Sequence, residues 1–212
     1  MADIAGNYYL CNMMDIDKTL EALGRGEWVR AGAKDSPEIS ELLGRCTAAC
    51  HRYNSLPPDA AADRDALLRS LLGECGPGAV IHSPFRCDFG FNIHIGANFM
   101  GNFNLAILDE ARVTIGDNVM IGPNCSLITI THALDAAQRN AGVMTGRPIT
   151  IGDNVWIAAG VTVLPGVSIG AGSVIGAGSV VVKDIPAGVL AVGAPCKVVR
   201  PITDADVISQ YI

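Results

Sequence analysis

Four histidines are the side chains of this chain that could take up a proton near neutral pH, His51, His82, His94 and His132. The first falls in an expected helix and reads as a surface or packing residue, while His82 and His94 lie in irregular stretches. His132 directly follows the run SLITIT and begins a segment with a different pattern. A rigid scaffold that ends at a covering loop suits a general base, and His132 is therefore our candidate.

The seven cysteines suggest a reduced chain, because their number is odd and no CxxC pair occurs. Cys46 and Cys50 stand one helical turn apart. We interpret them as small, partly buried thiols, because the other two ligands of a tetrahedral zinc are not evident in the sequence. Cys125 is expected in the core. No metal site and no metal requirement are predicted.

The element that must position His132 is a six-residue repeat. From Ile151 the chain reads IGDNVW, IAAGVT, VLPGVS, IGAGSV, IGAGSV and VVKDIP, and an aliphatic residue opens every unit. Six residues make about 1.67 helical turns, so these residues could not form one stripe on a helix. Hexapeptide repeats predict a parallel β-helix whose stacked coils bury one apolar column.

The repeat divides the chain into regions. It is imperfect from Gly78 to Arg112, clear at Ile115 and Ile121, and absent between Thr131 and Pro148. We therefore predict a β-helix over 76–202, an extruded loop at about 131–148, and a C-terminal tail over 203–212.

Residues 1–75 carry more charge and predict a small α-helical cap. Ser36-Pro37-Glu38 reads as the start of a helix that continues to about Tyr53. Asp59 is the expected cap of a second helix that stops at Gly73, and a shorter helix is expected from about Asp17 to Leu23. Such a cap would close one open end of the coil.

Composition limits the class of partner. The formal charge is −6 and the pI is near 5.1, which argues against nucleic acid as the main partner. No apolar run approaches the length of a membrane span, and the first residues do not resemble a secretory signal. We expect a cytoplasmic protein without a membrane partner.

Several motifs that go beyond the repeat itself occur together, namely NIHIG, NFNLAILD, NVWI, KDIP and GAPCKVVR. Over about residues 84–200 the chain resembles the maltose, galactoside and nodulation O-acetyltransferases of the hexapeptide-repeat family. The segment GRGEW and the helices after it resemble the family's cap more loosely. The resemblance implies a left-handed parallel β-helix, a homotrimer with sites between subunits, and direct transfer of an acetyl group from acetyl-CoA to a hydroxyl of a small acceptor, preferably a sugar or glycoside.

The resemblance also assigns residues. His132 matches the family's catalytic histidine, and Asn102 matches a residue close to both histidine and donor, although an asparagine in a turn or ladder is the alternative. The backbone N–H of Ala159 is the expected partner of the developing oxyanion. Residues matching the acceptor pocket are Asp88, Met100, Asn102, Glu110 and Met144. Residues matching the donor site are Asn102, Trp156, Ala159, Ala177, Val182, Lys183, Lys197 and Arg200.

The charges near the end of the chain support a donor site independently of the resemblance. The segment 183–200 holds three cations, Lys183, Lys197 and Arg200, against only one acidic residue, Asp184. The sequence departs from the family pattern in two places. Ala31 stands where an acidic residue is expected, with Asp35 a few positions on, which bears on sugar specificity. Ala133 stands where a proline is expected after the histidine, which bears on loop rigidity.

Other functions are compatible with this fold. The same donor could serve a serine or antibiotic acceptor. A zinc enzyme like the γ-class carbonic anhydrases would need three histidines around the metal, drawn from His82, His94 and His132. A non-catalytic hexapeptide scaffold is the third alternative, against which the presence of His132, Asn102 and the donor cations argues.

Overall fold

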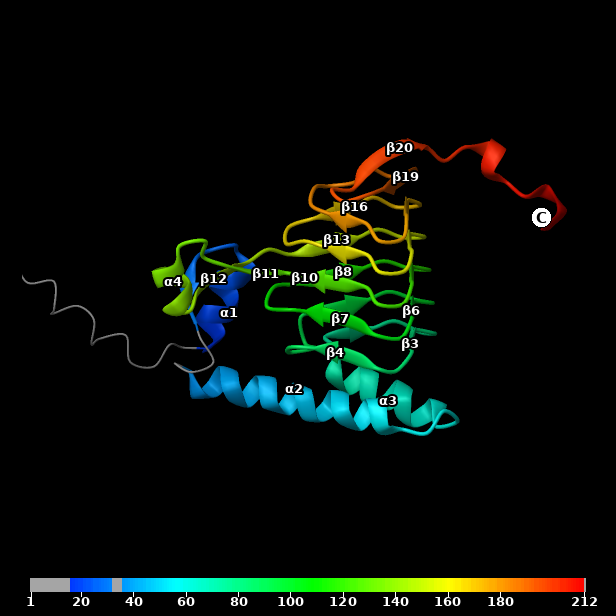
Figure 1. Ribbon diagram of the computed structural model, residues 1–212. Helices are drawn as coiled ribbons and strands as arrows, with labels where there is room; N and C mark the ends of the chain where they lie inside the picture. Colours follow the sequence, from blue (N-terminus) through cyan, green and yellow to red (C-terminus); the bar gives the residue numbers. More distant parts are fainter. Residues whose placement is uncertain (1–15, 32–35, 212) are drawn as a thin grey trace, which may run out of the picture.

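The computed structural model describes residues 16–31 and 36–211, so Asp35 and the first 15 residues lie outside the described part. The described chain forms a three-sided stack of β-coils, and two helices lie across one end of the stack (Figure 1). The predicted fold class, a mainly β parallel solenoid of hexapeptide repeats with few helices, is confirmed.

Each face of the coil is a sheet in which strands from successive coils pair in parallel. The first face contains β2 (Glu74–Cys75), β5 (Ile93–Ile95), β8 (Val113–Ile115), β13 (Ile149–Ile151) and β16 (Ser168–Ile169). The second contains β3 (Val80–Ile81), β6 (Met100–Gly101), β9 (Met120–Ile121), β14 (Trp156–Ile157), β17 (Val174–Ile175) and β19 (Val189–Val192). The third contains β4 (Phe85–Cys87), β7 (Leu105–Leu108), β10 (Ser126–Ile128), β15 (Thr162–Val163) and β18 (Val180–Val181).

The aliphatic residue that opens each repeat unit points into the coil. Ile151, Ile157 and Val163 are at most 1% exposed, and each pairs in register with the opening residue of the unit one coil above. Residues at the fifth position, such as Val155, are buried as well. The period of six therefore arises because every face contributes one inward residue and every turn a second.

The tight corners of the coil require a left-handed backbone at fixed positions. Asn104 and Asn124 have φ of 60°, and Gly160 takes the same place one coil higher with φ of 68°. Asparagine and glycine adopt this region more readily than other residues. The two asparagines also bond to one another, Nδ2 to Oδ1 at 2.9 Å.

Two helices cover the open end of the first coil. They are α2 (Pro37–Ser55) and α3 (Ala61–Leu71), and α2 lies across that end against β4 (Figure 1). Ser36 caps α2 as predicted, with its Oγ accepting from the Ile39 N–H at 3.3 Å. The predicted Asp59 cap of α3 is wrong. The N-cap is Ala60, whose N–H closes a turn onto the Pro57 carbonyl, so Asp59 lies one residue too early to cap the helix.

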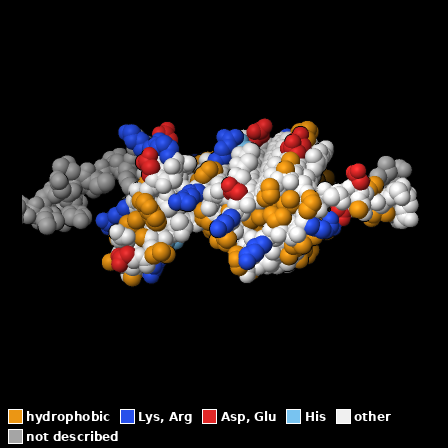
Figure 2. Space-filling view, turned by 90° about the horizontal axis from the view of Figure 1, so that it is seen from above, with side chains coloured by type: hydrophobic (Ala, Val, Ile, Leu, Met, Phe, Trp, Pro, Cys, Tyr) orange, Lys and Arg blue, Asp and Glu red, His pale blue; other side chains and the backbone are white. Residues whose placement is uncertain are grey.

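A small antiparallel sheet projects from the side of the coil and replaces the expected irregular loop. It is made of β1 (Val29–Arg30), β11 (Ile130–His132) and β12 (Val143–Gly146), in the order β1-β12-β11. Helix α4 (Ala136–Asn140) lies between β11 and β12, and α1 (Ile16–Gly24) leads into β1. We call α1, β1 and residues 130–146 the side lobe. Seen from above, it stands apart from the coil (Figure 2).

The far end of the coil is covered by β20 (Lys197–Pro201), which pairs antiparallel with β19. Two 3₁₀ turns follow, Asp204–Asp206 and Ser209–Tyr211. Among residues 16–31 and 36–211, no helix has the length and apolar character needed to cross a bilayer.

Candidate active site

Two corners of the coil carry the candidate residues. The entry corner joins the second face to the third and comprises 82–84, 102–104, 122–124, 158–160 and 176–178. The exit corner joins the third face back to the first and comprises 88–92, 109–112, 129–148, 164–167 and 182–184. The side lobe leaves the coil at the exit corner.

Asn102 occupies the entry corner directly above a histidine. The His82 N–H donates to the Gly101 carbonyl at 2.8 Å, and the Asn102 N–H donates to the Ile121 carbonyl, so His82 and Asn102 are equivalent residues of successive coils. The Oδ1 of Asn102 accepts from the Phe103 N–H at 2.8 Å. Asn102 thus does not belong to the asparagine ladder, and within the described chain its Nδ2 donates to no acceptor.

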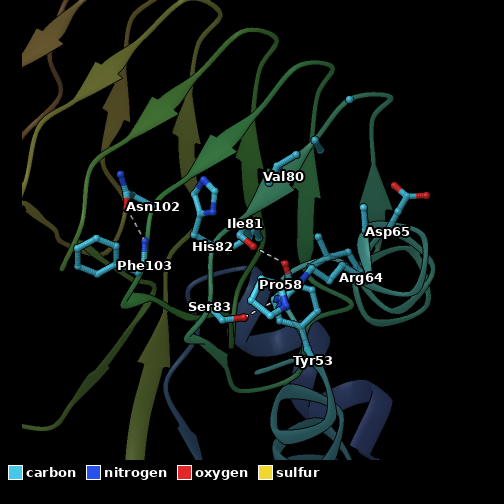
Figure 3. A pocket seen from close by; sticks show the side chains of 14 residues that line it. Tyr53, Pro58, Arg64, Asp65, Val80, Ile81, His82, Ser83, Asn102 and Phe103 are labelled. Atoms are coloured by element: carbon cyan, nitrogen blue, oxygen red, sulfur yellow. Dashed lines mark hydrogen bonds between the residues drawn. The ribbon is translucent and has the colours of Figure 1, made fainter. Parts of the chain in front are cut away.

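A surface pocket of about 800 Å³ opens at the foot of this corner. His82, Asn102 and Phe103 line it from the coil, while Tyr53 and Arg64 line it from the helices (Figure 3). The sequence analysis did not place His82 beside Asn102. The coil period could have done so, because His82 precedes Asn102 by 20 residues, the same spacing that separates the paired asparagines Asn104 and Asn124.

The predicted donor residues Ala159 and Ala177 stack higher on the same corner. The Gly178 N–H donates to the Ala159 carbonyl at 2.9 Å, which aligns the two coils. Within residues 16–31 and 36–211, the Ala159 N–H donates to no carbonyl. Small side chains and an available N–H can accept an extended ligand that carries a polarised carbonyl.

Three carboxyl groups gather at the exit corner. Asp109 is fully buried and accepts the N–H groups of Asp88 and Phe89 at 3.0 and 2.9 Å. Burial raises the pKa of Asp109 to about 6. Burial, with the adjacent Asp88 carboxyl, raises the pKa of Glu110 to about 8, and burial also raises the pKa of Asp88. The raised pKa of Glu110 favours its protonated form, which can donate a hydrogen bond.

Three buried oxygens at this corner lack a hydrogen-bond partner within the described chain. They are Asp109 Oδ2, Glu110 Oε2 and Thr145 Oγ1. An unpaired buried polar atom costs about 1–3 kcal/mol, so these three oxygens make the exit corner less stable than the regular coil.

The side lobe holds His132 and Met144 opposite one another. They are paired residues of β11 and β12, and Met144 also pairs with Val29 of β1. Met144 packs against a cluster containing Ala31 and Phe89, the residue after Asp88. The His132 side chain is exposed.

The two departures from the family pattern have structural counterparts. The Ala133 N–H donates to the Val143 carbonyl at 3.0 Å, a bond that a proline could not make. Ala31 is 3% exposed and presents a methyl group to the cluster that holds Met144. The Asp35 position lies outside the described residues.

The cations assigned to the donor are all exposed, but they differ in their partners. Lys183 follows β18 at the exit corner, next to the exposed Val182, and Lys197 begins β20. Arg200 makes two bonds to Asp206, at 2.7 and 2.6 Å. The segment 183–200 holds only Asp184 against them, as predicted, but Asp206 of the C-terminal tail adds a second carboxylate that pairs with Arg200.

The outward residues of the second face form one apolar column. The column contains Val80, Met100, Met120, Trp156, Val174 and Leu190, each in register with the next. Trp156 and Met120 are 49% and 47% exposed. The first face shows Glu74, His94 and Thr114 at equivalent places. An exposed apolar column of this kind marks an interaction surface.

Within one chain, the residues expected nearest to the reacting groups fall into two sets, while Met100 and Trp156 lie on the second face and Lys197 and Arg200 on β20. His132, Asp88, Glu110 and Met144 lie at the exit corner or in the side lobe, whereas Asn102 and the two alanines lie at the entry corner. The third face separates them by the length of a strand, about 10 Å, and Figure 1 shows β12 and β6 on opposite sides of the coil.

His94 lies elsewhere, on β5 with its Nδ1 3.6 Å from Glu74, so the three histidines of a zinc site do not meet within one chain.

Three profiles of known families match the chain. Residues 148–183 match the bacterial transferase hexapeptide (six repeats), 33–76 match the maltose acetyltransferase hexapeptide capping motif, and 112–131 match the hexapeptide repeat of succinyl-transferase.

Relatives match over most of their length. Nodulation protein L of Rhizobium meliloti is 52% identical over 76% of this chain and 88% of its own. A solved galactoside acetyltransferase in complex with coenzyme A has a TM-score of 0.84 at 40% identity, covering 92% of this chain and 94% of its own. A maltose O-acetyltransferase from Clostridium difficile 630 has a TM-score of 0.83 at 40% identity, with coverage of 88% and 98%. The chain therefore belongs to the hexapeptide-repeat family of acetyl-CoA-dependent acetyltransferases.

Proposed function

We propose that this acetyltransferase moves the acetyl group of acetyl-CoA directly to a hydroxyl of a small polyhydroxylated acceptor, a sugar or glycoside, with His132 as general base. The observation that carries the acceptor class is the pair of partly exposed carboxyl groups at the exit corner, Asp88 and Glu110, whose pKa values are raised. Neighbouring hydroxyls of a sugar can both donate and accept, so they match a corner that holds carboxylate acceptors and a protonated Glu110.

The acceptor hydroxyl needs a base because an alcohol is a poor nucleophile while protonated. His132 can take this proton as the hydroxyl oxygen attacks the thioester carbonyl carbon, and can return it to the sulfur when the carbon–sulfur bond breaks. Its position supports this role, since β12 holds β11 in place by antiparallel pairing.

Acetyl-CoA supplies the activated acetyl group and a thiolate leaving group. The free N–H of Ala159 is suited to the negative charge that develops on the thioester oxygen, and Asn102 Nδ2 is suited to holding the acceptor or the carbonyl. Lys183 and Lys197 are the cations available to the phosphates of the donor, and Arg200 is a third whose guanidinium is paired with Asp206.

We further propose that the active enzyme is a homotrimer with each site formed between two chains. The entry-corner and exit-corner groups lie on opposite sides of one coil, so a neighbouring copy must supply one of them. The apolar column of the second face, which includes Met100 beside Asn102, supports a contact between copies at this edge. A cytoplasmic location stays a prediction.

The acceptor is tested by a screen of alcohols in which thiol release from acetyl-CoA is measured. Sugars and glycosides should give the highest kcat/KM, and product analysis should show an O-acetyl ester. A preference for serine or for antibiotics would overturn the sugar assignment, while thiol release with no acceptor would overturn the transferase mechanism.

The shared site is tested with mixed oligomers of His132→Ala and Asn102→Ala chains. Each variant alone should be nearly inactive. In an equal mixture, a given interface has the intact histidine from one chain and the intact asparagine from its neighbour in about one quarter of cases, so about a quarter of wild-type activity should return. No recovery in mixed trimers, verified by mass, would mean that both residues serve one chain's site.

A further inference from the structure

Three buried cysteine thiols meet where the helices contact the first coil. Cys46 and Cys50 lie one turn apart on α2, and Cys87 ends β4. The Sγ of Cys87 is 3.5 Å from that of Cys46 and 3.7 Å from that of Cys50. Their exposed fractions are 4%, 0% and 8%. Over residues 16–31 and 36–211, no other group of three histidine, cysteine or acidic side chains brings its ligand atoms within 4.8 Å of one another.

The spacing of the sulfur atoms fits a metal ion. Zinc binds thiolates at about 2.3 Å in tetrahedral geometry, which sets neighbouring sulfurs about 3.8 Å apart. The observed separations of 3.5 and 3.7 Å are within a few tenths of this value. Hydrogen bonds between thiols are weak, so the thiols by themselves gain little from converging on one point.

The surroundings of the three thiols permit entry of an ion. A second surface pocket, of about 440 Å³, is lined by Cys46 together with Phe89 and residues of α2 and α3.

We propose that Cys46, Cys50 and Cys87 bind one thiophilic metal ion of the zinc type, with the fourth position open to a small ligand from the pocket. Such an ion would join α2 to β4, in addition to their apolar packing and the two hydrogen bonds between Asn54 and the Phe85 backbone. It would also fix the backbone at Cys87, immediately before Asp88 of the exit corner. The site is structural in this proposal and is independent of the acetyl-transfer mechanism.

The test uses the full chain, stripped of metal and kept reduced with a phosphine. Titration with Co²⁺ should reach an end point near one equivalent per chain, with a thiolate-to-cobalt charge-transfer band that Zn²⁺ abolishes. Zn²⁺ at about a hundredfold excess over its Kd should raise Tm by about 5–10 °C. A wild-type chain that shows neither the band nor the Tm shift overturns the proposal.

Variants locate the ion. Cys87→Ser should lose the charge-transfer band, while Cys75→Ser, which removes a half-buried thiol outside the cluster, should keep it. An unchanged band in a folded Cys87→Ser chain would also overturn the proposal. If that variant does not fold, Cys50→Ser serves instead, and the wild-type titration decides independently. None of these readouts requires acetyl-CoA, so their failure would leave the proposed transferase function intact.

Discussion

The coil above residue 149 and the side lobe with its exit corner are built on opposite principles. In the coil, the first and fifth residues of each unit are buried, every corner repeats, and Ala159 and Ala177 contribute backbone and little side chain. At the exit corner, carboxyl groups are buried with their pKa values raised, and oxygens lack partners. The regular region is suited to holding a long donor, and the irregular region holds the carboxyl groups whose pKa values are raised. Rigidity and chemistry are thus divided between neighbouring parts of one scaffold.

The largest effect is expected where the side lobe supplies chemistry. His132→Ala should lower kcat for acetyl transfer by about 10²–10⁴, the range for loss of a general base. The dissociation constant for CoA, measured by calorimetry, should stay nearly the same. His51→Ala, on the exposed face of α2, is the control. A wild-type rate in His132→Ala would remove the side lobe from the catalytic site.

The regular coil should respond through stability instead. Ile157 is fully buried, and Ile157→Ala should lower the free energy of unfolding by about 2–5 kcal/mol through lost burial and a cavity. Leu134 in the side lobe is 95% exposed, and Leu134→Ala should change the free energy of unfolding by less than about 0.5 kcal/mol. Denaturant titration measures both, and equal losses would contradict the contrast.

The buried carboxyl at the exit corner should make stability depend on pH. Folded Glu110 binds a proton more tightly than the unfolded chain does, since its pKa is about 8 instead of 4.5. Stability is therefore lost as pH rises from about 4.5 through about 8. Glu110→Gln should remove this loss. The free energy of unfolding of the variant minus that of the wild type should therefore be about 1–3 kcal/mol larger at pH 9 than at pH 5. Glu41→Gln, on the exposed side of α2, should show no such difference in denaturant titrations at the two pH values.

The donor cations should have smaller effects, because they are exposed. Lys183→Ala should weaken CoA binding about twofold to fivefold at low salt, and the difference should shrink at high salt. Binding measured at two ionic strengths checks this. A salt-independent loss would point to packing, not charge.

The smallest effect is expected from the partner of Arg200. Asp206→Asn frees the guanidinium, and CoA should bind up to about twofold more tightly if Arg200 reaches its phosphates. Asp204→Asn, in the same 3₁₀ turn, is the matched control. Weaker binding of CoA by Asp206→Asn would indicate that the ion pair positions Arg200.

The amino-acid sequence by itself determined the coil, because a period of six can bury its aliphatic residues only in a stacked β-helix, and it determined the cap of α2 through Ser36. It also indicated the family, since motifs such as NVWI and GAPCKVVR go beyond the repeat. Tertiary structure alone decided which distant residues meet. Cys87 joins Cys46 and Cys50 across 41 and 37 residues. The distribution of Asn102 and His132 over opposite corners was also invisible in the sequence. Local patterns report which side chains are buried, whereas the side lobe and the tail are placed by contacts that have no period along the chain.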